Sequence, residues 1–387
     1  MGEGWWVGEE ELDDDQKDVI ALPLSGNHLV TGPPGSGKTN LLLLRGNYLS
    51  LAGNPDIAII VFSRALQEFI ASGAKTYSFP KDKIQTSRRW AQQLLFQYGV
   101  FAAPPDGFDE QRKYFLEEVK DLIDKKKLLH IYDAILLDEA QDYLPDEIEI
   151  FSRLAKSIFA VADSRQKIYT TPDPLEALRS LVKGREHNLR YQYRCGRQIC
   201  KLADGLARDS VGFVSLLRSS HYDEASKPSS VEHARASGMD QQAKKIIERL
   251  EVQLRAYPNE LFGVLCPRSE DVDQLWSLLA SSPLGKLCSL QKGGDHSSFD
   301  PAKPIIVGTF HSAKGVEFRG VHLAACESLK RFRLQRNMSY MAVTRCKTSL
   351  SIYYSDDLPG YFEKALAELG PARDLPKIKD VFAGRRA

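Results

Sequence analysis

The segment at residues 32–39 has the residue types and the spacing of a phosphate-binding loop. It reads Gly-Pro-Pro-Gly-Ser-Gly-Lys-Thr, follows an apolar run at residues 28–31 and opens a leucine-rich helical stretch. Glycines let backbone N–H groups converge on phosphate oxygens, and the N-terminus of the following helix adds its dipole. We expect Lys38 to reach the β- and γ-phosphates and the Thr39 hydroxyl to bind Mg²⁺. The other residues expected to cradle phosphate are Gly32, Gly35, Ser36 and Gly37.

A carboxylate pair follows another apolar run about a hundred residues later. Residues 134–137 read Ala-Ile-Leu-Leu and are followed at once by Asp138 and Glu139. At a strand end, Asp138 can hold the water shell of Mg²⁺ opposite Thr39, and Glu139 can polarise a water for in-line attack on the γ-phosphate. The two motifs together predict hydrolysis of a nucleoside triphosphate, and not binding alone.

The elements that must position these residues alternate along the chain. The 387 residues suggest two or three domains, and 43% hydrophobic with 27% charged residues is typical of a folded globular protein. Apolar runs predict strands, and amphipathic stretches between them predict helices, so we expect parallel sheets of βαβ units in two α/β domains. The expected strands are residues 28–31, 57–62, 134–137, 158–162, 262–266, 305–309, 321–324 and 350–354.

Charge and composition exclude several protein classes. The 52 Lys and Arg residues balance 51 Asp and Glu residues, so a wholly basic nucleic-acid binder is excluded, whereas a local basic groove is not. No apolar run is long enough to span a bilayer, and the chain does not start with a secretory signal pattern. Six scattered cysteines without zinc spacing indicate free thiols in a reducing compartment. We therefore expect a cytoplasmic protein that has no membrane partner.

More motifs follow in order, and the whole set resembles the UvrD/Rep-like branch of superfamily 1 DNA helicases. Two of them are specific as a pair: His-Ser-Ala-Lys-Gly-Val-Glu-Phe at residues 311–318 and Ala-Val-Thr-Arg at residues 342–345. The resemblance extends from residue 12 to about residue 354. The matching pieces are residues 12–16, 32–39, 61–64, 86–91, 138–142, 162–169, 191–195, 309–318 and 340–345.

The resemblance implies an α/β fold of two RecA-like P-loop domains, residues 1–180 and 181–387, with ATP and Mg²⁺ at their cleft. It implies that Gln16 reads the adenine edge, Tyr193 stacks on the base and Glu317 contacts the ribose. Gln166 would sense the γ-phosphate. Arg194 and Arg345 would act as arginine fingers from the second domain, which suits the planar, permanently charged guanidinium.

The family binds single-stranded DNA across both domains, and RNA remains an alternative because the sequence shows no base-reading code. Aromatic side chains can stack on bases, while hydroxyl groups and arginine can hold phosphates. Trp90 heads a helical run and is expected to pack inside the protein instead. The expected nucleic-acid contacts are Phe62, Ser63, Arg64, Thr86, Tyr169, Thr309 and His311.

Three departures from the family pattern bear on function. Thr170 and Thr171 stand where an Arg-Trp pair is usual, and Asn40 stands where an arginine often sandwiches the base. The gaps at residues 86–138 and 268–309 are too short for the accessory domains of large helicases. We therefore expect the motor core alone.

These departures leave a second function open. The chain could be an effector-coupled ATPase switch that senses DNA ends or a protein partner, such as a nuclease, in a repair or phage-defence complex with little unwinding. A small-molecule kinase would explain residues 32–39 but not residues 311–318 or Arg345.

Overall fold

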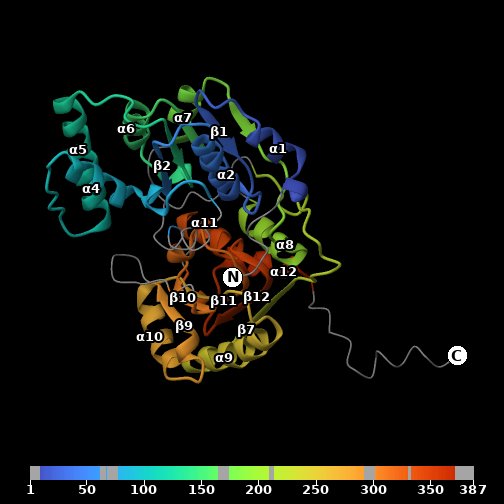
Figure 1. The fold of residues 1–387 in the computed structure, drawn as a ribbon. Helices are drawn as coiled ribbons and strands as arrows, with labels where there is room; N and C mark the ends of the chain where they lie inside the picture. The colour runs from blue at the N-terminus through green and yellow to red at the C-terminus, as the bar shows by residue number, and fades with distance from the viewer. Residues whose placement is uncertain are drawn as a thin grey trace.

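Two six-stranded sheets form the core of the protein, each flanked by helices on both faces (Figure 1). The structure is a computed structural model that describes residues 9–61, 67, 77–163, 174–208, 213–291, 300, 302–329 and 333–370. Every strand pair in these ranges is parallel. The α/β fold with two RecA-like domains expected from the sequence is therefore confirmed.

The first sheet has the strand order β3-β2-β4-β5-β1-β6. Its inner strands are almost wholly apolar because helices bury both of their faces. The strands are β1 (His28–Thr31), β2 (Ile57–Val61), β3 (Ile84–Thr86), β4 (Ala134–Leu137), β5 (Ile158–Ala162) and β6 (Glu186–Asn188). Helices α1 (Asp14–Ile20) and α2 (Lys38–Leu51) pack on one face. The other face carries α4 (Ser87–Gln97), α5 (Phe108–Lys126), α6 (Pro145–Leu154) and α7 (Pro174–Val182).

The second sheet has the strand order β7-β12-β11-β8-β10-β9. Its strands are β7 (Ser230–Arg235), β8 (Phe262–Cys266), β9 (Cys288–Gln291), β10 (Ile305–Thr309), β11 (Phe318–Leu323) and β12 (Cys346–Tyr354). One face packs against α8 (Arg197–Ala207), α11 (Arg333–Val343) and α12 (Gly360–Ala367). The other face packs against α9 (Met239–Ala256) and α10 (Ser269–Ala280).

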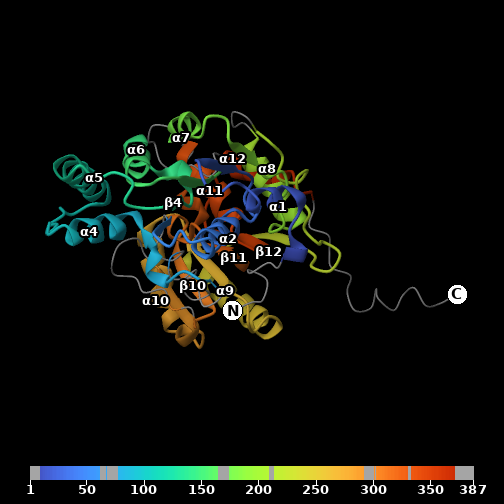
Figure 2. The same ribbon diagram turned by 45° about the horizontal axis from the view of Figure 1, so that its top comes forward.

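The two domains meet through the α8, α11 and α12 side of the second sheet, while α9 and α10 cover its far face (Figures 1 and 2). Helices α4 and α5 project from the side of the first domain in both views. Strand β6 pairs with β1 in the first sheet. We therefore propose that the boundary between the domains lies after Asn188, a few residues beyond the division at residue 180 that the motifs suggest.

Two further observations concern the chemistry of the chain. All six cysteines are buried, and none forms a disulfide. Among the described helices, none combines the length and the apolar composition that a membrane span requires.

Candidate active site

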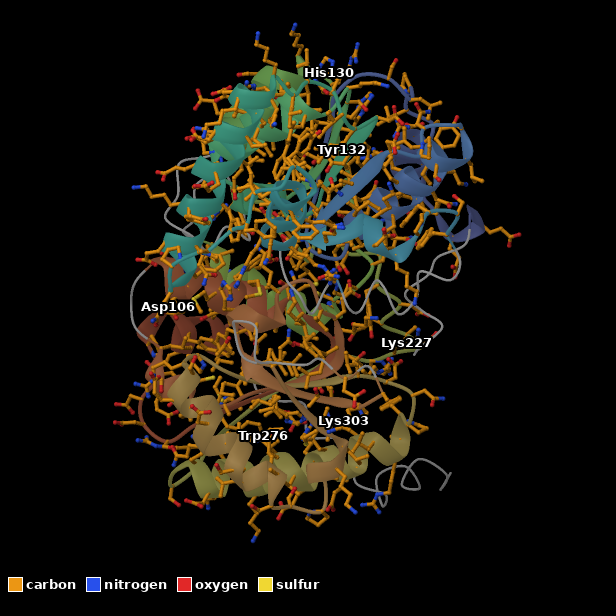
Figure 3. All side chains as sticks on the ribbon, turned by 60° about the vertical axis from the view of Figure 1, so that its left-hand side comes forward. Asp106, His130, Tyr132, Lys227, Trp276 and Lys303 are labelled. Atoms are coloured by element: carbon orange, nitrogen blue, oxygen red, sulfur yellow. The ribbon has the colours of Figure 1, made fainter. Side chains whose placement is uncertain are left out.

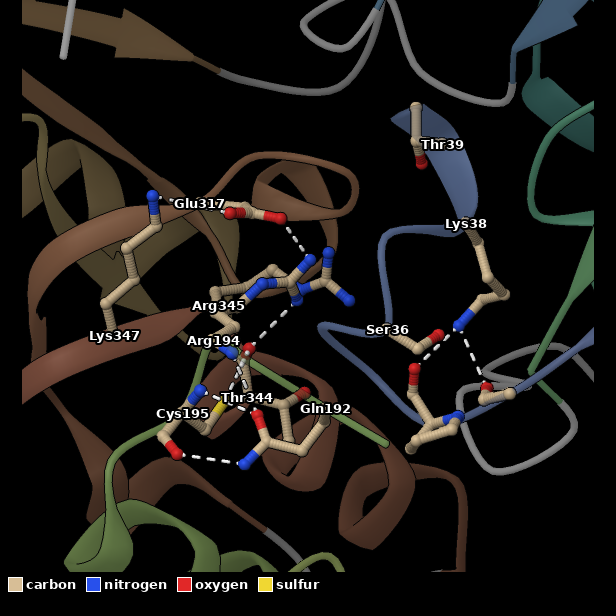
Figure 4. A network of polar contacts seen from close by, with 12 residues as sticks. Ser36, Lys38, Thr39, Gln192, Arg194, Cys195, Glu317, Thr344, Arg345 and Lys347 are labelled. Atoms are coloured by element: carbon tan, nitrogen blue, oxygen red, sulfur yellow. Dashed lines mark hydrogen bonds and ion pairs between the residues drawn. The ribbon is translucent and has the colours of Figure 1, made fainter. Parts of the chain in front are cut away.

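The phosphate-binding loop connects β1 to α2 and depends on glycine at two positions. Gly35 and Gly37 have φ angles of +77° and +82°, where a residue with a side chain is strained. Lys38, the first residue of α2, donates from Nζ to the carbonyl oxygens of Gly32 (2.9 Å) and Pro33 (2.8 Å) (Figure 4). The loop therefore surrounds the ammonium group of Lys38. These hydrogen bonds hold that group in the region where the loop is expected to bind phosphate.

Thr39 and Asp138 lie together at the base of this loop. The Thr39 hydroxyl donates to the two carboxylate oxygens of Asp138 at 3.1 and 3.3 Å. Asp138 directly follows β4, and its own N–H donates to the carbonyl oxygen of Ile60 on β2 (3.0 Å). Burial, together with the neighbouring charge of Glu139, raises the pKa of Asp138 to about 7.

These two residues fit Mg²⁺. Both supply oxygen, which Mg²⁺ prefers, and a buried carboxyl beside a second carboxylate is stabilised in its charged form by a cation. No group of three or more His, Cys, Asp or Glu residues in the described part of the chain could hold a metal alone. An ion bound at Thr39 and Asp138 would take one hydroxyl and one carboxylate from the protein and its other ligands from water and substrate phosphates.

Glu139 lies in a strained turn right after Asp138. Its φ angle is +48°, in the left-handed region that residues other than glycine rarely adopt. Its carboxylate accepts a hydrogen bond from Gln141, whose own oxygen accepts the N–H of Asp163 at the end of β5 (2.9 Å). Burial alone would raise the pKa of Glu139, but Lys314, Arg345 and Lys38 together lower it below the ordinary value. Glu139 is therefore a charged carboxylate that is held in one orientation.

Two arginines face the loop from the other side. The guanidinium groups of Arg194 and Arg345 lie between Glu317 and the phosphate-binding loop (Figure 4). Arg194 donates to Glu317 and to the carbonyl oxygen of Thr344 (3.2 Å), and Arg345 is only 2% exposed. Burial alone would raise the pKa of Glu317, but Arg194 and Lys347 lower it to about 2. In this conformation the ion pair with Glu317 therefore orients the guanidinium group of Arg194.

Sequence reasoning missed the part played by Gln192. Its side chain is fully buried, and its oxygen accepts the N–H groups of Arg194 (3.0 Å) and Cys195 (2.8 Å). Its amide donates to the carbonyl oxygen of Cys195 (3.0 Å) and to Ser220 (2.6 Å). Gln192 therefore fixes the backbone that carries Arg194. Its place inside the motif at residues 191–195 was the signal available.

Hydrogen bonds connect the start of α1 to the phosphate-binding loop and to the segment that carries Arg194. Gln16 donates to the carbonyl oxygen of Ser36 (3.0 Å) and exchanges capping hydrogen bonds with Asp13. The Tyr193 hydroxyl donates to the Asp13 carboxylate, and Arg190 forms a bidentate ion pair with Asp15. Gln16 and Tyr193, the two residues expected to contact the adenine base, are thus brought together through Asp13.

Lys314 is a second residue that the sequence did not single out. It lies just after the short turn that follows β10, and it is 1% exposed. Its ammonium forms ion pairs with Asp142 and, at 3.5 Å, with Glu139. These ion pairs connect the second sheet to the first. Residue spacing alone cannot reveal a contact of this kind.

The expected nucleic-acid residues lie at the carboxyl edges of the sheets where the structure describes them. Thr86 ends β3 and caps α4, with its hydroxyl accepting the N–H of Arg89 (3.3 Å). Thr309 ends β10, and His311 lies in the following turn. Burial and the charge of Lys314 lower the pKa of His311 to about 4, so its ring is neutral near pH 7. Four expected contacts and the expected γ-phosphate sensor lie outside the described residues: Phe62, Ser63, Arg64, Tyr169 and Gln166.

Trp90 packs inside the first domain, as expected. It is 4% exposed, and its ring meets that of Phe151 edge-on with centroids 5.0 Å apart. Its indole N–H donates to the hydroxyl of Tyr132 (3.2 Å), which Figure 3 shows within the first domain.

Comparison with known proteins agrees with this geometry. Residues 16–172 match the family model of an AAA domain. The match covers the phosphate-binding loop and the Asp138–Asp142 segment, although it extends over less than half of the chain. Together with the site geometry it supports a P-loop ATPase of the helicase-motor kind in general.

Solved structures and curated sequences add little. One matching structure is the C-terminal domain of a possible DNA helicase from Lactobacillus plantarum WCFS1, at 14% identity and a TM-score of 0.33. The match covers 46% of this chain and 96% of that domain, and at this TM-score it carries no functional argument. No curated protein sequence matches the chain.

Proposed function

We propose that this chain is a Mg²⁺-dependent ATPase stimulated by single-stranded DNA, acting as a translocase or helicase motor of the UvrD/Rep type. The observation that carries the proposal is the composite site. Lys38 and Thr39 come from the first domain, whereas Arg194 and Arg345 come from beyond the last strand of the first sheet (Figure 4). A single-domain nucleotide-binding protein has no need of such an arrangement.

Each residue has a defined task in hydrolysis. Lys38 releases the loop carbonyls and binds the β- and γ-phosphates, while Thr39 and Asp138 hold Mg²⁺, which neutralises phosphate charge when bound. Glu139 orients the attacking water and accepts its proton. Arg194 and Arg345 stabilise charge on the γ-phosphate in the transition state.

Because both domains contribute residues to the ATP site, hydrolysis is linked to movement of one domain relative to the other. ATP is held by the loop of the first domain and by cations of the second, so its γ-phosphate favours the closed arrangement of the two. Hydrolysis and phosphate release remove that contact. Thr86 and Thr309 end strands of different sheets, so a strand of nucleic acid that contacts both is displaced as the domains open and close.

The test is ATP turnover measured with and without single-stranded DNA, with single-stranded RNA as a parallel arm. We expect stimulation by DNA and loss of turnover in both Lys38→Ala and Glu139→Gln. Glu139→Gln should still bind ATP because it keeps the shape of the site. Lys244→Ala and Glu248→Gln, exposed positions on α9, are matched controls that should behave like wild type.

Two results contradict the proposal in different ways. Absence of stimulation by any DNA or RNA tested excludes a nucleic-acid motor but leaves the ATPase intact. Turnover that survives in Lys38→Ala or Glu139→Gln shows that the catalytic residues are wrongly assigned.

One feature favours the effector-coupled switch as a second candidate. The α4–α5 hairpin exposes Phe96 (64%), Phe101 (81%) and Phe108 (57%), and residues 90–110 contain three acidic residues but no Lys, Arg or His. Such a tip would repel phosphates, so it suits a basic, apolar segment of a protein partner. Strand displacement on tailed duplexes separates the candidates, because robust unwinding by the isolated chain excludes the switch.

A further inference from the structure

Tyr193, the residue expected to stack on the base of the nucleotide, has an aromatic neighbour that lies outside all the matching motifs. The ring of His221 meets the ring of Tyr193 edge-on, with centroids 5.7 Å apart and planes at 79°. His221 is also stacked on Tyr191, with centroids 4.0 Å apart and planes at 19°. The guanidinium carbon of Arg190 lies 5.3 Å from the centroid of the Tyr191 ring. Tyr193 therefore belongs to a cluster of three rings and one cation.

Backbone pairing holds the segment of His221 beside the segment of Tyr193. The N–H of His221 donates to the carbonyl oxygen of Gln192 (2.9 Å), and the N–H of Gln192 donates to the carbonyl oxygen of Ser219 (2.8 Å). These bonds form a parallel bridge between Gln192 and Ser220, and the Gln192 side-chain amide donates to the Ser220 hydroxyl (2.6 Å). The segment that carries His221 therefore cannot move away from Tyr193 without breaking these hydrogen bonds.

The same segment is anchored in the core of the second domain. Leu216 is fully buried there, and its N–H donates to the buried carboxylate of Asp204 on α8 (2.6 Å). On the other side of His221, the hydroxyl groups of Tyr222 and Thr348 lie 3.1 Å apart, and Thr348 belongs to β12. His221 is therefore held between two points that are fixed to the second domain.

His221 is placed to set the plane of the Tyr193 ring. The N–H of Tyr193 donates to the carbonyl oxygen of Gly35 (3.0 Å), and its hydroxyl donates to the Asp13 carboxylate. The hydroxyl oxygen lies on the axis about which the ring turns, and rotation about such an sp³–sp² bond is broad. A neighbour at the side of the ring therefore decides which way its faces point. Aromatic pairs prefer edge-on and offset-stacked arrangements such as those of His221.

The base site of this chain has a reason to depend on the plane of this ring. Asn40 stands where an arginine often sandwiches the base, and an amide lacks the broad, charged plane of a guanidinium group. A base therefore has Tyr193 as its main stacking surface. An edge-on neighbour covers at most one face of that ring, so this contact leaves a face for the base.

We propose that His221 is a positioning residue that orients the Tyr193 ring for stacking and so determines the preference of the site for purine nucleotides. This inference rests on the proposed function and deepens it, because it assigns nucleotide selectivity to a residue outside the motifs. It concerns the departure at Asn40, where stacking on Tyr193 must do more than in a site that sandwiches the base.

A positioning role of this kind depends on the base, which distinguishes it from a structural role. The contacts of Lys38 and Thr39 with phosphate and Mg²⁺ are expected to be the same for every nucleotide. Stacking increases with the area of the base that the ring covers, so a purine gains more from a correctly turned ring than a pyrimidine does. A triphosphate without a base gains nothing. A residue that only stabilises the fold would change all three affinities alike.

The experiment measures nucleotide binding and hydrolysis by the full chain. His221→Ala removes the ring, and His221→Phe keeps an aromatic ring at the same position. The matched control is His233→Ala on the edge strand β7, because the His233 ring is also stacked on a tyrosine, Tyr354, with centroids 6.2 Å apart. Displacement of a fluorescent ATP analogue by ATP, CTP or inorganic tripolyphosphate, each with Mg²⁺, gives three affinities. Steady-state hydrolysis of ATP gives KM and kcat.

We expect His221→Ala to bind ATP about three- to tenfold more weakly than wild type, CTP less than about twofold more weakly, and tripolyphosphate equally well. The KM for ATP should rise by a similar factor while kcat stays within about twofold of wild type. His221→Phe should recover most of the affinity for ATP, and His233→Ala should behave like wild type.

The contrary results lead to different conclusions. Wild-type affinity for ATP in His221→Ala overturns the inference and leaves the ATPase proposal standing. Equal losses for ATP, CTP and tripolyphosphate also overturn it, because they show that His221 acts through the fold and not through the base. A wild-type chain that binds neither ATP nor tripolyphosphate overturns the proposed function, and the inference with it.

Discussion

The Cα atom of Gly35 in the phosphate-binding loop packs directly against Arg194. A Cβ at Gly35 would lie 2.5 Å from the Cβ of Arg194, closer than real Cβ atoms approach any neighbour. The N–H of Tyr193 also donates to the carbonyl oxygen of Gly35 (3.0 Å). The loop that holds phosphate and the segment that carries an arginine are therefore in contact backbone to backbone, and a change in one is felt by the other.

Gly35→Ala should lower the affinity for ATP by about tenfold or more. The left-handed backbone is strained with a side chain, by about 1–2 kcal/mol, and the added methyl group must displace Arg194. Equilibrium binding of a fluorescent ATP analogue measures the effect. Gly53→Ala is the matched control, because Gly53 has a similar φ of +84° but no atom within 4 Å. An equal loss of affinity in both variants would mean that backbone strain, and not the contact with Arg194, is responsible.

Arg345→Ala should reduce kcat by about 10³-fold while changing the affinity for ATP only a few-fold. A positioned arginine acts mainly on the charge of the transition state, and mutations of such arginines have effects of that size. Single-turnover hydrolysis with saturating DNA separates kcat from binding. Arg208→Ala, which removes an exposed ion pair with Glu368 in the same domain, should leave both quantities at wild-type values. A large rise in KM with unchanged kcat would assign Arg345 to ground-state binding instead.

The strands that were predicted and those that were missed differ in position. All eight expected strands appear, with shifted ends at β11 and β12 and with the last expected residue of β2, residue 62, outside the described residues; they are the inner strands of the two sheets. The four that escaped prediction are β3, β6, β7 and β9, which are the four sheet edges. An edge strand such as Glu186–Asn188 is short and polar because one of its sides faces solvent, so it lacks the continuous apolar run that marks a buried strand.

The site residues also differ in whether the sequence could predict them. Residues joined by a local motif, such as Lys38 with Thr39 or Asp138 with Glu139, were predicted because the required chemistry fixes their spacing. Lys314 was missed because its partner Asp142 lies 172 residues away and on another sheet. Nothing in local spacing indicates which of the many lysines will be buried against which acid. That information exists only once the domains are packed.

Tyr193→Phe should raise the KM for ATP about five- to tenfold, since it removes the hydroxyl that donates to Asp13 and keeps the ring. A hydrogen bond to a charged group contributes about 1.5–3 kcal/mol, and this one holds the turn that presents Gln16. Tyr193→Ala should have a larger effect because it also removes the stacking surface. Steady-state kinetics measure both. Tyr354→Phe, which removes a hydroxyl contact with His233 (3.2 Å), is the control. Wild-type KM in Tyr193→Phe would show that the Asp13 contact does not position the base site.

His322 should make the folded state less stable as the pH falls below neutrality. Its ring is fully buried, with Nε2 donating to Gln253 (2.8 Å) and Nδ1 accepting from the Tyr353 hydroxyl (3.2 Å), an arrangement that suits the neutral ring. Burial, together with the charge of Arg249, lowers the pKa of His322 to about 3. Between pH 6.5 and pH 3 the unfolded chain therefore binds more protons than the folded chain, so stability declines as pH falls. From pH 7 to pH 5 the free energy of unfolding contributed by this residue falls by about 2 kcal/mol.

Urea unfolding at several pH values gives the slope of the free energy of unfolding against pH. This slope should be shallower in His322→Gln and unchanged in His233→Gln, a substitution at an exposed site. An equal slope in wild type and His322→Gln would show that His322 is not the group responsible.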